Sequence, residues 1–434
     1  MVITQVIGVG IFLTPAAMMR AVGGLAPALM VWAVVGVLSI AGALCYAELA
    51  TRFPKAGGGY VFLREAFGPR TAFVFGWMSL LVTDPGITAA LAIGLSRYVQ
   101  ATIGRPVMAP SLIAAGVVCL FGLLTLAGRS ASGAVLRWTA AAKLTIVAVL
   151  VGAGAVRAGS AEVSITATGG VTTPGIESLA GAVIAAFFAF GGWWELGRMS
   201  EEVESPRRTM PRALIGGVAI VTIVYSLITV AYALSAPGRI SGSDDAFVAQ
   251  VGEALFGATA AQLLAAMVVV AVSGSLAATL LAAPRMYLAM ARDGVFPGRW
   301  VRFDEERGRA TGATLIQTGL ACLLIAVGTF DQILGYFMPV TILFLGLSAA
   351  ALLKLPRPAD DGHIFRAPWH PLPIVLFLLL IGVVLVLVVA GQPRETLIGG
   401  AIAALGVPAS FLVSRSPLRP PRRPETAGGQ PRSG

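Results

Sequence analysis

Long runs of apolar residues alternate with short polar stretches along the whole chain. A membrane-spanning helix needs about 20 predominantly apolar residues, and the runs are close to that length. We predict about twelve such helices, centred near residues 10, 37, 84, 118, 147, 187, 224, 273, 320, 343, 380 and 404. The polar stretches between them are short. The pattern therefore predicts an all-α polytopic membrane protein without an extramembrane domain.

Glycines interrupt two of these predicted helices. The first interruption is "IGVGIF" at Ile7–Phe12, and the second is "AFGGWWEL" at Ala189–Leu196, five predicted helices later. Broken helices at corresponding positions are typical of transporters built from two inverted repeats. We therefore expect a first repeat at 1–157, a second at 175–355 and two further helices at 370–413. The Pro- and Arg-rich residues 415–434 are predicted to form a disordered cytoplasmic tail.

A broken helix presents unpaired backbone groups, which membrane proteins tolerate only beside a cavity or inside protein. Its second half begins with free N–H groups, and its first half ends with free carbonyls. The N–H groups near Gly10 and Ile11 could hold a carboxylate, and the carbonyls near Val6–Gly8 and Phe187–Phe190 could hold an ammonium group. This pair of charges fits a zwitterionic α-amino acid. Glycines that only allow close helix packing are the alternative. The predicted substrate-binding residues are Ile7, Gly8, Val9, Gly10, Ile11, Phe190, Gly191, Gly192, Trp193 and Trp194.

Composition supports the membrane assignment, because 57% of the residues are hydrophobic and only 12% are charged, against about a quarter charged in soluble domains. The net charge of +10 is explained by topology. If the N-terminus is inside, all but six of the 31 Lys and Arg residues fall on the inner side. The positive-inside rule then places both termini in the cytoplasm, in a plasma (inner) membrane. Nucleic acid is therefore not an expected partner.

Nothing in the sequence indicates an enzyme, a cofactor or a metal site. There is no metal-ligand spacing, nucleophile elbow or phosphate-binding loop, and the only histidines are His363 and His370. The three cysteines, Cys45, Cys119 and Cys322, all lie in apolar segments, so no disulfide framework is expected.

Five stretches resemble the amino acid–polyamine–organocation (APC) superfamily, and within it the bacterial relatives of the L-type amino acid exchangers. They are "IGVGIF" and the segments Tyr46–Pro69, Ala189–Leu214, Pro284–Pro297 and Phe365–Val375. The resemblance implies a LeuT-like fold of two inverted five-helix repeats, with helices 1 and 6 broken and two helices added. It also implies a secondary transporter of amino acids that works by alternating access, either by sodium-independent exchange or by proton coupling.

The chain departs from the family pattern at several places. Val9 is bulkier than the usual residue, and Trp194 and Glu195 stand where relatives often have small polar residues. Residues 97–110 contain no cysteine, so the disulfide-linked heavy chain of animal relatives is not an expected partner. Few residues precede Gly8, and we therefore expect the native chain to begin further upstream.

Three charged residues within predicted helices are candidates for coupling. The resemblance implies that Lys143 replaces the sodium ion of distant relatives and bridges helix 5 to helix 1 near Val9–Ile11, as a fixed charge or a proton carrier. A lysine that extends to the membrane surface is the alternative. Asp84 could face a substrate amine, relay a proton or satisfy a neighbouring donor. Glu195 could sense protons, contact a cationic substrate or pair with Arg198.

Aromatic and charged residues near the second interruption suggest gates. We expect at least one of Phe190, Trp193 and Trp194 to close over the substrate, with Phe12 as a weaker candidate. The regions Glu201–Arg212 and Arg285–Asp293 are predicted to form cytoplasmic ion pairs. The expected partners are thus a small amino acid, membrane lipid and, for symport, protons. The alternatives are a polyamine or cationic amine carrier, favoured only if Asp84 and Glu195 line the site, and a non-transporting sensor of the same fold.

Overall fold

The computed structural model describes residues 7–8, 10–127, 129–158, 175–203, 205–235, 246–296, 303–304, 309–356 and 364–412. Val9, His363 and the predicted tail at 415–434 lie outside these residues. The described chain is almost entirely helical, as predicted. It includes one short antiparallel pair of strands, β1 (Phe303–Asp304) and β2 (Arg309–Ala310).

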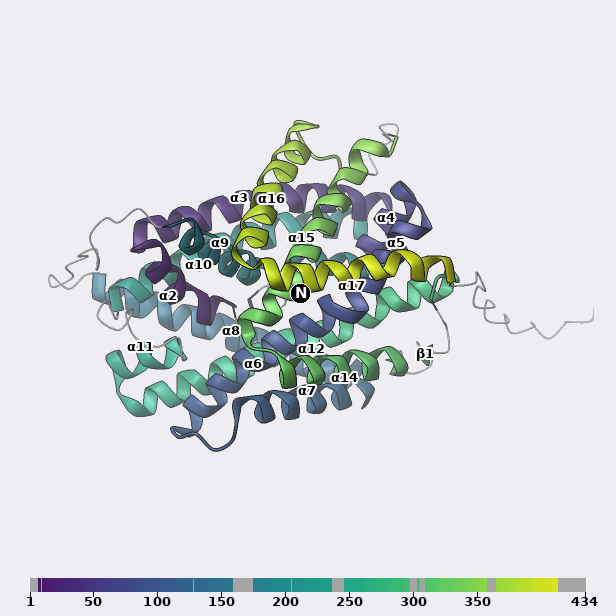
Figure 1. Ribbon diagram of the computed structural model, residues 1–434. Helices are drawn as coiled ribbons and strands as arrows, with labels where there is room; N and C mark the ends of the chain where they lie inside the picture. The colour runs from purple at the N-terminus through teal and green to yellow at the C-terminus, as the bar shows by residue number, and fades with distance from the viewer. Residues whose placement is uncertain are drawn as a thin grey trace, which may run out of the picture.

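The helices run through the whole described chain (Figure 1). In chain order they are α2 (Gly10–Val22), α3 (Leu25–Arg52), α4 (Gly59–Phe67), α5 (Pro69–Met78), the π-helix η1 (Ser79–Thr83), α6 (Asp84–Ile103), α7 (Pro110–Ala127), α8 (Arg129–Ala158), α9 (Ile176–Phe190), the 3₁₀-helix η2 (Trp193–Glu202), α10 (Pro206–Ser235), α11 (Phe247–Phe256), α12 (Ala258–Arg292), α14 (Thr311–Val327), α15 (Phe330–Lys354), α16 (Leu372–Gly391) and α17 (Pro393–Leu412).

Eight helical segments of the described chain are long and apolar enough to cross a membrane. Four shorter apolar helices, Gly10–Val22, Ala141–Val156, Phe247–Phe256 and Thr311–Val327, accompany them. Each of the twelve predicted centres falls within a helix. The outer faces keep large apolar side chains exposed, such as Leu379, Val383 and Val386 on α16. Because an aqueous surface would not favour such a face, the protein is an integral membrane protein.

Helices that are far apart in the sequence pack together in pairs. α2 packs against α9, α3 against α10, α6 against α12, and α7 against α14. In Figure 1 the pair of α7 and α14 lies along the lower edge of the molecule. Each pair joins one predicted span to the span five positions later. The first of these pairs brings the two glycine interruptions together.

Three local irregularities shape the centre of the molecule. α9 ends at Phe190, and η2 begins at Trp193 after Gly192, whose φ of 104° is accessible mainly to glycine. α2 begins at Gly10, where a Cβ would lie only 2.6 Å from the Cα of Ala189. The π-helix η1 widens one turn immediately before Asp84, as π-bulges often do at functional sites.

Candidate functional site

A central cavity lies where the two interruptions meet. Its volume is about 50 Å³, which is room for a few water molecules and far below the roughly 300–1,000 Å³ of typical ligand pockets. An amino acid can therefore enter only if the surrounding helices move apart. The lining residues are Gly8, Gly10, Asp84, Ile87, Leu91, Phe188, Ala189, Gly191, Gly192, Trp194, Glu195, Thr279, Phe337 and Met338.

The cavity contains part of the predicted binding set. Gly8, Gly10, Gly191, Gly192 and Trp194 line it, as do the predicted coupling residues Asp84 and Glu195. Ile7 and Ile11 are buried beside it but do not contribute to its wall.

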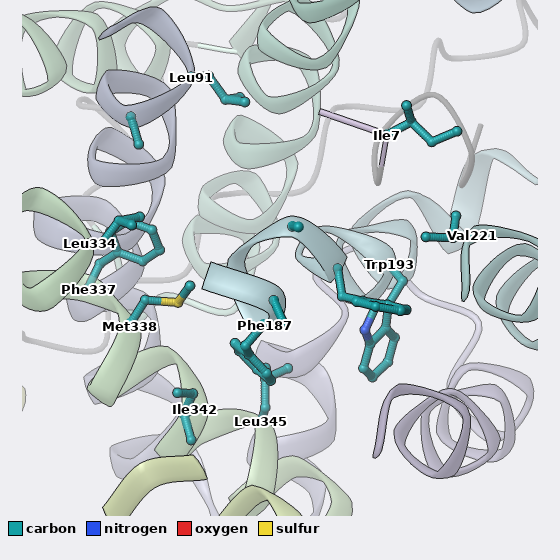
Figure 2. Close-up of a cluster of buried hydrophobic side chains, with 14 of the residues drawn as sticks. Ile7, Leu91, Phe187, Trp193, Val221, Leu334, Phe337, Met338, Ile342 and Leu345 are labelled. Carbon is teal, nitrogen blue, oxygen red and sulfur yellow. The ribbon is translucent and has the colours of Figure 1, made fainter. Parts of the chain in front are cut away.

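Two of the predicted gate aromatics lie elsewhere. The Phe190 ring packs against Trp32 and Tyr225, with ring centroids 5.7 and 5.3 Å away. The Trp193 ring packs edge-on against Tyr46 at 5.2 Å. Figure 2 shows Trp193 on one side of the broken segment, and Phe337 and Met338 on the other. Trp194 is thus the member of the predicted trio that faces the cavity.

Sequence reasoning missed the apolar half of the wall, which Phe188, Ile87, Leu91, Phe337 and Met338 provide. These residues stand in apolar helices that are buried on several sides, so periodicity does not reveal which side faces a cavity. Phe188 is two residues before the predicted Phe190. That position is close in sequence, but about half a helical turn away on the surface of α9.

The backbone near the second interruption already has internal hydrogen bonds. The Tyr225 hydroxyl donates to the carbonyl of Ala189 (2.9 Å), and the Gly191 N–H donates to the carbonyl of Phe188 (3.0 Å). A carbonyl oxygen can accept two hydrogen bonds. The predicted ammonium-binding carbonyls are therefore held in place by the protein and still have accepting capacity.

Lys143 on α8 is fully buried, which excludes the alternative that it extends to the membrane surface. Its Nζ donates to Ser275 Oγ on α12 (2.7 Å), and Ser275 Oγ in turn donates to the carbonyl of Ile7 (3.3 Å). The ammonium group is thus linked through one serine to the backbone at the first interruption. Ser275 was not anticipated, because nothing in its local sequence distinguishes it from other serines in apolar helices.

A second polar group in the core consists of Asp84, Glu195, Arg198 and Tyr287, which we call the buried cluster. Arg198 Nη1 donates to both carboxylate oxygens of Asp84, at 2.9 Å each, and Arg198 Nε lies 2.8 Å from Glu195 Oε2. The Tyr287 hydroxyl donates to Asp84 Oδ2. All four side chains are at least nine-tenths buried. The pair of Glu195 and Arg198 is one of the predicted alternatives, whereas the contacts of Arg198 and Tyr287 with Asp84 were not predicted.

A wide cavity of about 880 Å³ lies beyond one end of the central cavity, between the end of α6, α11 and the beginning of α12. An aromatic contact separates the two spaces. Phe188 lines the central cavity and packs edge-on against Phe330, which lines the wide one, with centroids 5.5 Å apart. The Arg97 guanidinium lies 5.9 Å from the Phe330 centroid.

At the other end lies a small cavity of about 20 Å³, whose wall includes Ser79 and Thr341. Trp194 and Glu195 line both this cavity and the central one, so they form the partition between them. The Trp194 ring is stacked on Phe187 with centroids 6.1 Å apart. Side chains of the described residues thus separate the central cavity from the wide cavity at one end and from the small cavity at the other.

Ion pairs lie further along on the side of the small cavity. Asp293 accepts a hydrogen bond from the Tyr60 hydroxyl (2.9 Å) and is paired with Arg64. Arg292 Nη1 lies 3.5 Å from Glu201 Oε2. These contacts join the end of α12 to α4 and η2. The pair of Arg292 and Glu201 connects the two regions predicted to form ion pairs, whereas the contacts of Asp293 with α4 were not predicted.

Comparison with known proteins agrees with this architecture. Residues 1–404 match the family model described as "Amino acid permease". The human "Cystine/glutamate transporter" is 31% identical over 422 residues, covering 95% of this chain and 83% of the relative. The human "Large neutral amino acids transporter small subunit 2" is 29% identical over 433 residues, covering 95% and 78%.

The mouse "b(0,+)-type amino acid transporter 1" is 28% identical over 395 residues, which cover 89% of this chain and 80% of the relative. These relatives are transporters and not enzymes. The family match covers nearly all of the described helices, including both interruptions and the cavity between them. This chain therefore belongs to the amino acid permease family of the APC superfamily.

Proposed function

We propose that the protein is a secondary active transporter that moves amino acids across the plasma (inner) membrane by alternating access. The observation that carries this proposal is the central cavity, which lies between the start of α2 at Gly10 and the break between α9 and η2. The relatives named above carry amino acids according to their names. A closed cavity between a wide cavity and a small one suits a carrier that opens to one side at a time.

The substrate backbone would bind at the two interruptions. Its carboxylate would accept hydrogen bonds from N–H groups at the start of α2, near Gly10 and Ile11, where a helix N-terminus favours an anion. Its ammonium would face carbonyls that end the preceding segments, near Gly8 and Phe188. Ile7 would contribute backbone only, and Val9 lies outside the described residues.

Lys143 supports sodium-independent exchange as the mode of transport. Its ammonium lies beside Ser275, which contacts the carbonyl of Ile7. A positive charge at this point could stabilise the carbonyls of the first interruption without a metal ion. Proton-coupled uptake is the second mode, in which Lys143, Asp84 or Glu195 would carry the proton.

The topology proposed for the chain follows from the distribution of its charged residues and from the pairing of its helices. Both termini would be cytoplasmic, so the wide cavity near Arg97 would open to the outside and the small cavity to the inside. The pairing of α2 with α9, α3 with α10, α6 with α12 and α7 with α14 supports two repeats at 1–157 and 175–355. We expect membrane lipid around the helices and no disulfide-linked heavy chain, since Cys119 and Cys322 lie within α7 and α14 and Cys45 is buried.

Uptake of labelled amino acids into proteoliposomes tests the proposal. Vesicles would contain unlabelled amino acid or none, with and without an inward proton gradient. Uptake that needs internal amino acid and ignores the gradient supports exchange, and uptake driven by the gradient supports symport. Binding without flux under every condition would indicate a sensor, and the absence of both would contradict the proposal.

A cationic amine carrier is a second candidate that one observation favours. Asp84 and Glu195 both line the central cavity, which is the condition under which this alternative was expected to hold. Arg198 contacts both carboxylates. Whether they can also bind a cationic substrate therefore depends on the net charge of the whole buried cluster.

A further inference from the structure

We propose that Glu195 Oε1 binds a second ammonium group of the substrate, carried on its side chain, so that the protein selects amino acids with a cationic side chain. The proposal rests on the proposed amino acid transport and adds the class of substrate. It is carried by two observations on the buried cluster: its charges do not balance, and one of its oxygens lacks a partner.

The buried cluster contains two carboxylates and one guanidinium. Arg198 Nη1 donates to both oxygens of Asp84, and Arg198 Nε contacts Glu195. Tyr287 donates a hydrogen bond but brings no charge. Ionised in this way, the cluster carries one negative charge in excess. An unbalanced charge away from water is costly, because buried charges are stable only when paired.

The unsatisfied atom is on the carboxylate that faces the cavity. Glu195 Oε2 contacts Arg198, whereas no described group donates to the buried Glu195 Oε1 with hydrogen-bond geometry. The Trp194 side chain is the polar neighbour of the same carboxylate. The Glu195 side chain is only 6% exposed and lines the central cavity. A carboxylate oxygen without a donor is the group that an ammonium ion would bind through a charge-assisted hydrogen bond.

The rest of the cavity wall suits the stem of such a side chain. Ile87, Leu91, Phe337 and Met338 present apolar surface, which can cover the methylene groups between the two ammonium groups of a diamino acid. The α-ammonium and carboxylate would remain at the glycine interruptions. The end of the side chain would then lie beside Glu195, on the partition between the central and small cavities.

Lys143 is the other buried cation in the described core, and it lies in a different place. It donates to Ser275 on α12 and is linked to Ile7. It does not line the central cavity. Lys143 therefore balances the carbonyls at the first interruption, and the charge missing beside Glu195 remains to be supplied by the occupant of the cavity.

The test compares ornithine with norleucine, which replaces the side-chain ammonium by a methyl group. Thermal unfolding of the detergent-purified protein is followed with each compound, and uptake of each labelled compound is measured in proteoliposomes. We expect ornithine to bind at least about tenfold more tightly than norleucine, as a hydrogen bond between charged groups implies. Glu195→Gln should reduce that preference by about tenfold or more.

Glu201→Gln is the matched control, because Glu201 lies on the same helix η2 but is exposed and paired with Arg292. It should leave the preference unchanged. Equal or weaker binding of ornithine by the native protein would overturn the proposal, and this comparison needs no variant. The proposal also fails if Glu195→Gln folds and keeps the full preference.

A pH-sensitive dye inside the vesicles distinguishes a proton from a substrate ammonium. Norleucine uptake could be accompanied by inward proton flux in the native protein but not in Glu195→Gln. That result would show that a proton supplies the missing charge, and it would overturn the proposal. Exchange of norleucine in preference to ornithine would contradict this inference but would still support the proposed amino acid transport. Ornithine binding that depends on Glu195, without flux of either compound, would support the inference and contradict the proposed transport.

Discussion

Arg198 is the residue on which the buried cluster depends, since it contacts Asp84 and Glu195 at once. Its contact with Glu195 was predictable because the two residues are three positions apart on one helix. Its contact with Asp84 joins residues 114 positions apart, and no local pattern indicates such a pair. Sequence thus identified the charged residues of the site and the local pair of Glu195 with Arg198, but it could not assign the partners of Asp84.

Replacing Arg198 by Met should strongly destabilise the protein, because it leaves two buried carboxylates without their cation. Removing one partner of a buried ion pair costs about 3–5 kcal/mol. The double variant Asp84→Asn with Arg198→Met removes both charges of the main pair. We expect it to lose less stability than Asp84→Asn alone and Arg198→Met alone lose in sum. Thermal unfolding in detergent measures all three. A double variant as unstable as the sum of the single ones would show that the pair is not coupled.

The link from Lys143 to the first interruption leads to a second prediction. Lys143→Met should lower the uptake rate by at least about tenfold, because it removes a charged hydrogen bond, while Ser275→Ala should have a smaller effect in the same direction. Lys354→Met is the control, since Lys354 lies at the end of α15, over the Phe67 ring. Normal uptake by folded Lys143→Met would remove the lysine from the mechanism.

At the scale of helices, the apolar pattern was sufficient to place the centres of all twelve predicted spans within helices. The glycines in "AFGGWWEL" also located the break between α9 and η2, because few other residues fit the left-handed turn at Gly192. Gly10 of "IGVGIF" lies at the start of α2, in a contact with Ala189 that only glycine allows. The π-helix at Ser79–Thr83 and the 3₁₀-helix at Trp193–Glu202 were not predictable. Both depend on tertiary contacts that override the ordinary preference for an α-helix.

A substitution that adds one methyl group can test how closely α2 approaches α9. Gly10→Ala would place a Cβ 2.6 Å from the Cα of Ala189, so one helix must shift and the backbone geometry of the binding site changes. We expect uptake to fall by at least about tenfold, as for misplaced groups at a binding site. Gly216→Ala on α10 is the control, because a Cβ there meets nothing within 4 Å. Equal uptake by the two variants would argue against tight packing at the interruptions.

At the scale of the whole molecule, the contacts of Asp293 with Tyr60 and Arg64 join the end of α12 to α4, and we expect them to keep the side of the small cavity closed. Asp293→Asn should weaken this closure and favour the form open to that side. In a Ser79→Cys background, a membrane-impermeant thiol reagent supplied from that side should then react several-fold faster, because Ser79 lines the small cavity. Asp331→Asn, an exposed change at the start of α15, should not alter the rate. Unchanged labelling in Asp293→Asn would assign the closure to other contacts.

The partition formed by Trp194 and Glu195 between the central and small cavities has an electrical consequence. Among the described residues, this partition and the Phe188–Phe330 contact at the other end separate the central cavity from the small and the wide cavities. The membrane voltage, worth about 2.3 kcal/mol per elementary charge at 100 mV, therefore falls across packed side chains and is not discharged through the protein. A high abundance of such a carrier would therefore not dissipate the ion gradients that drive the cell's other transporters.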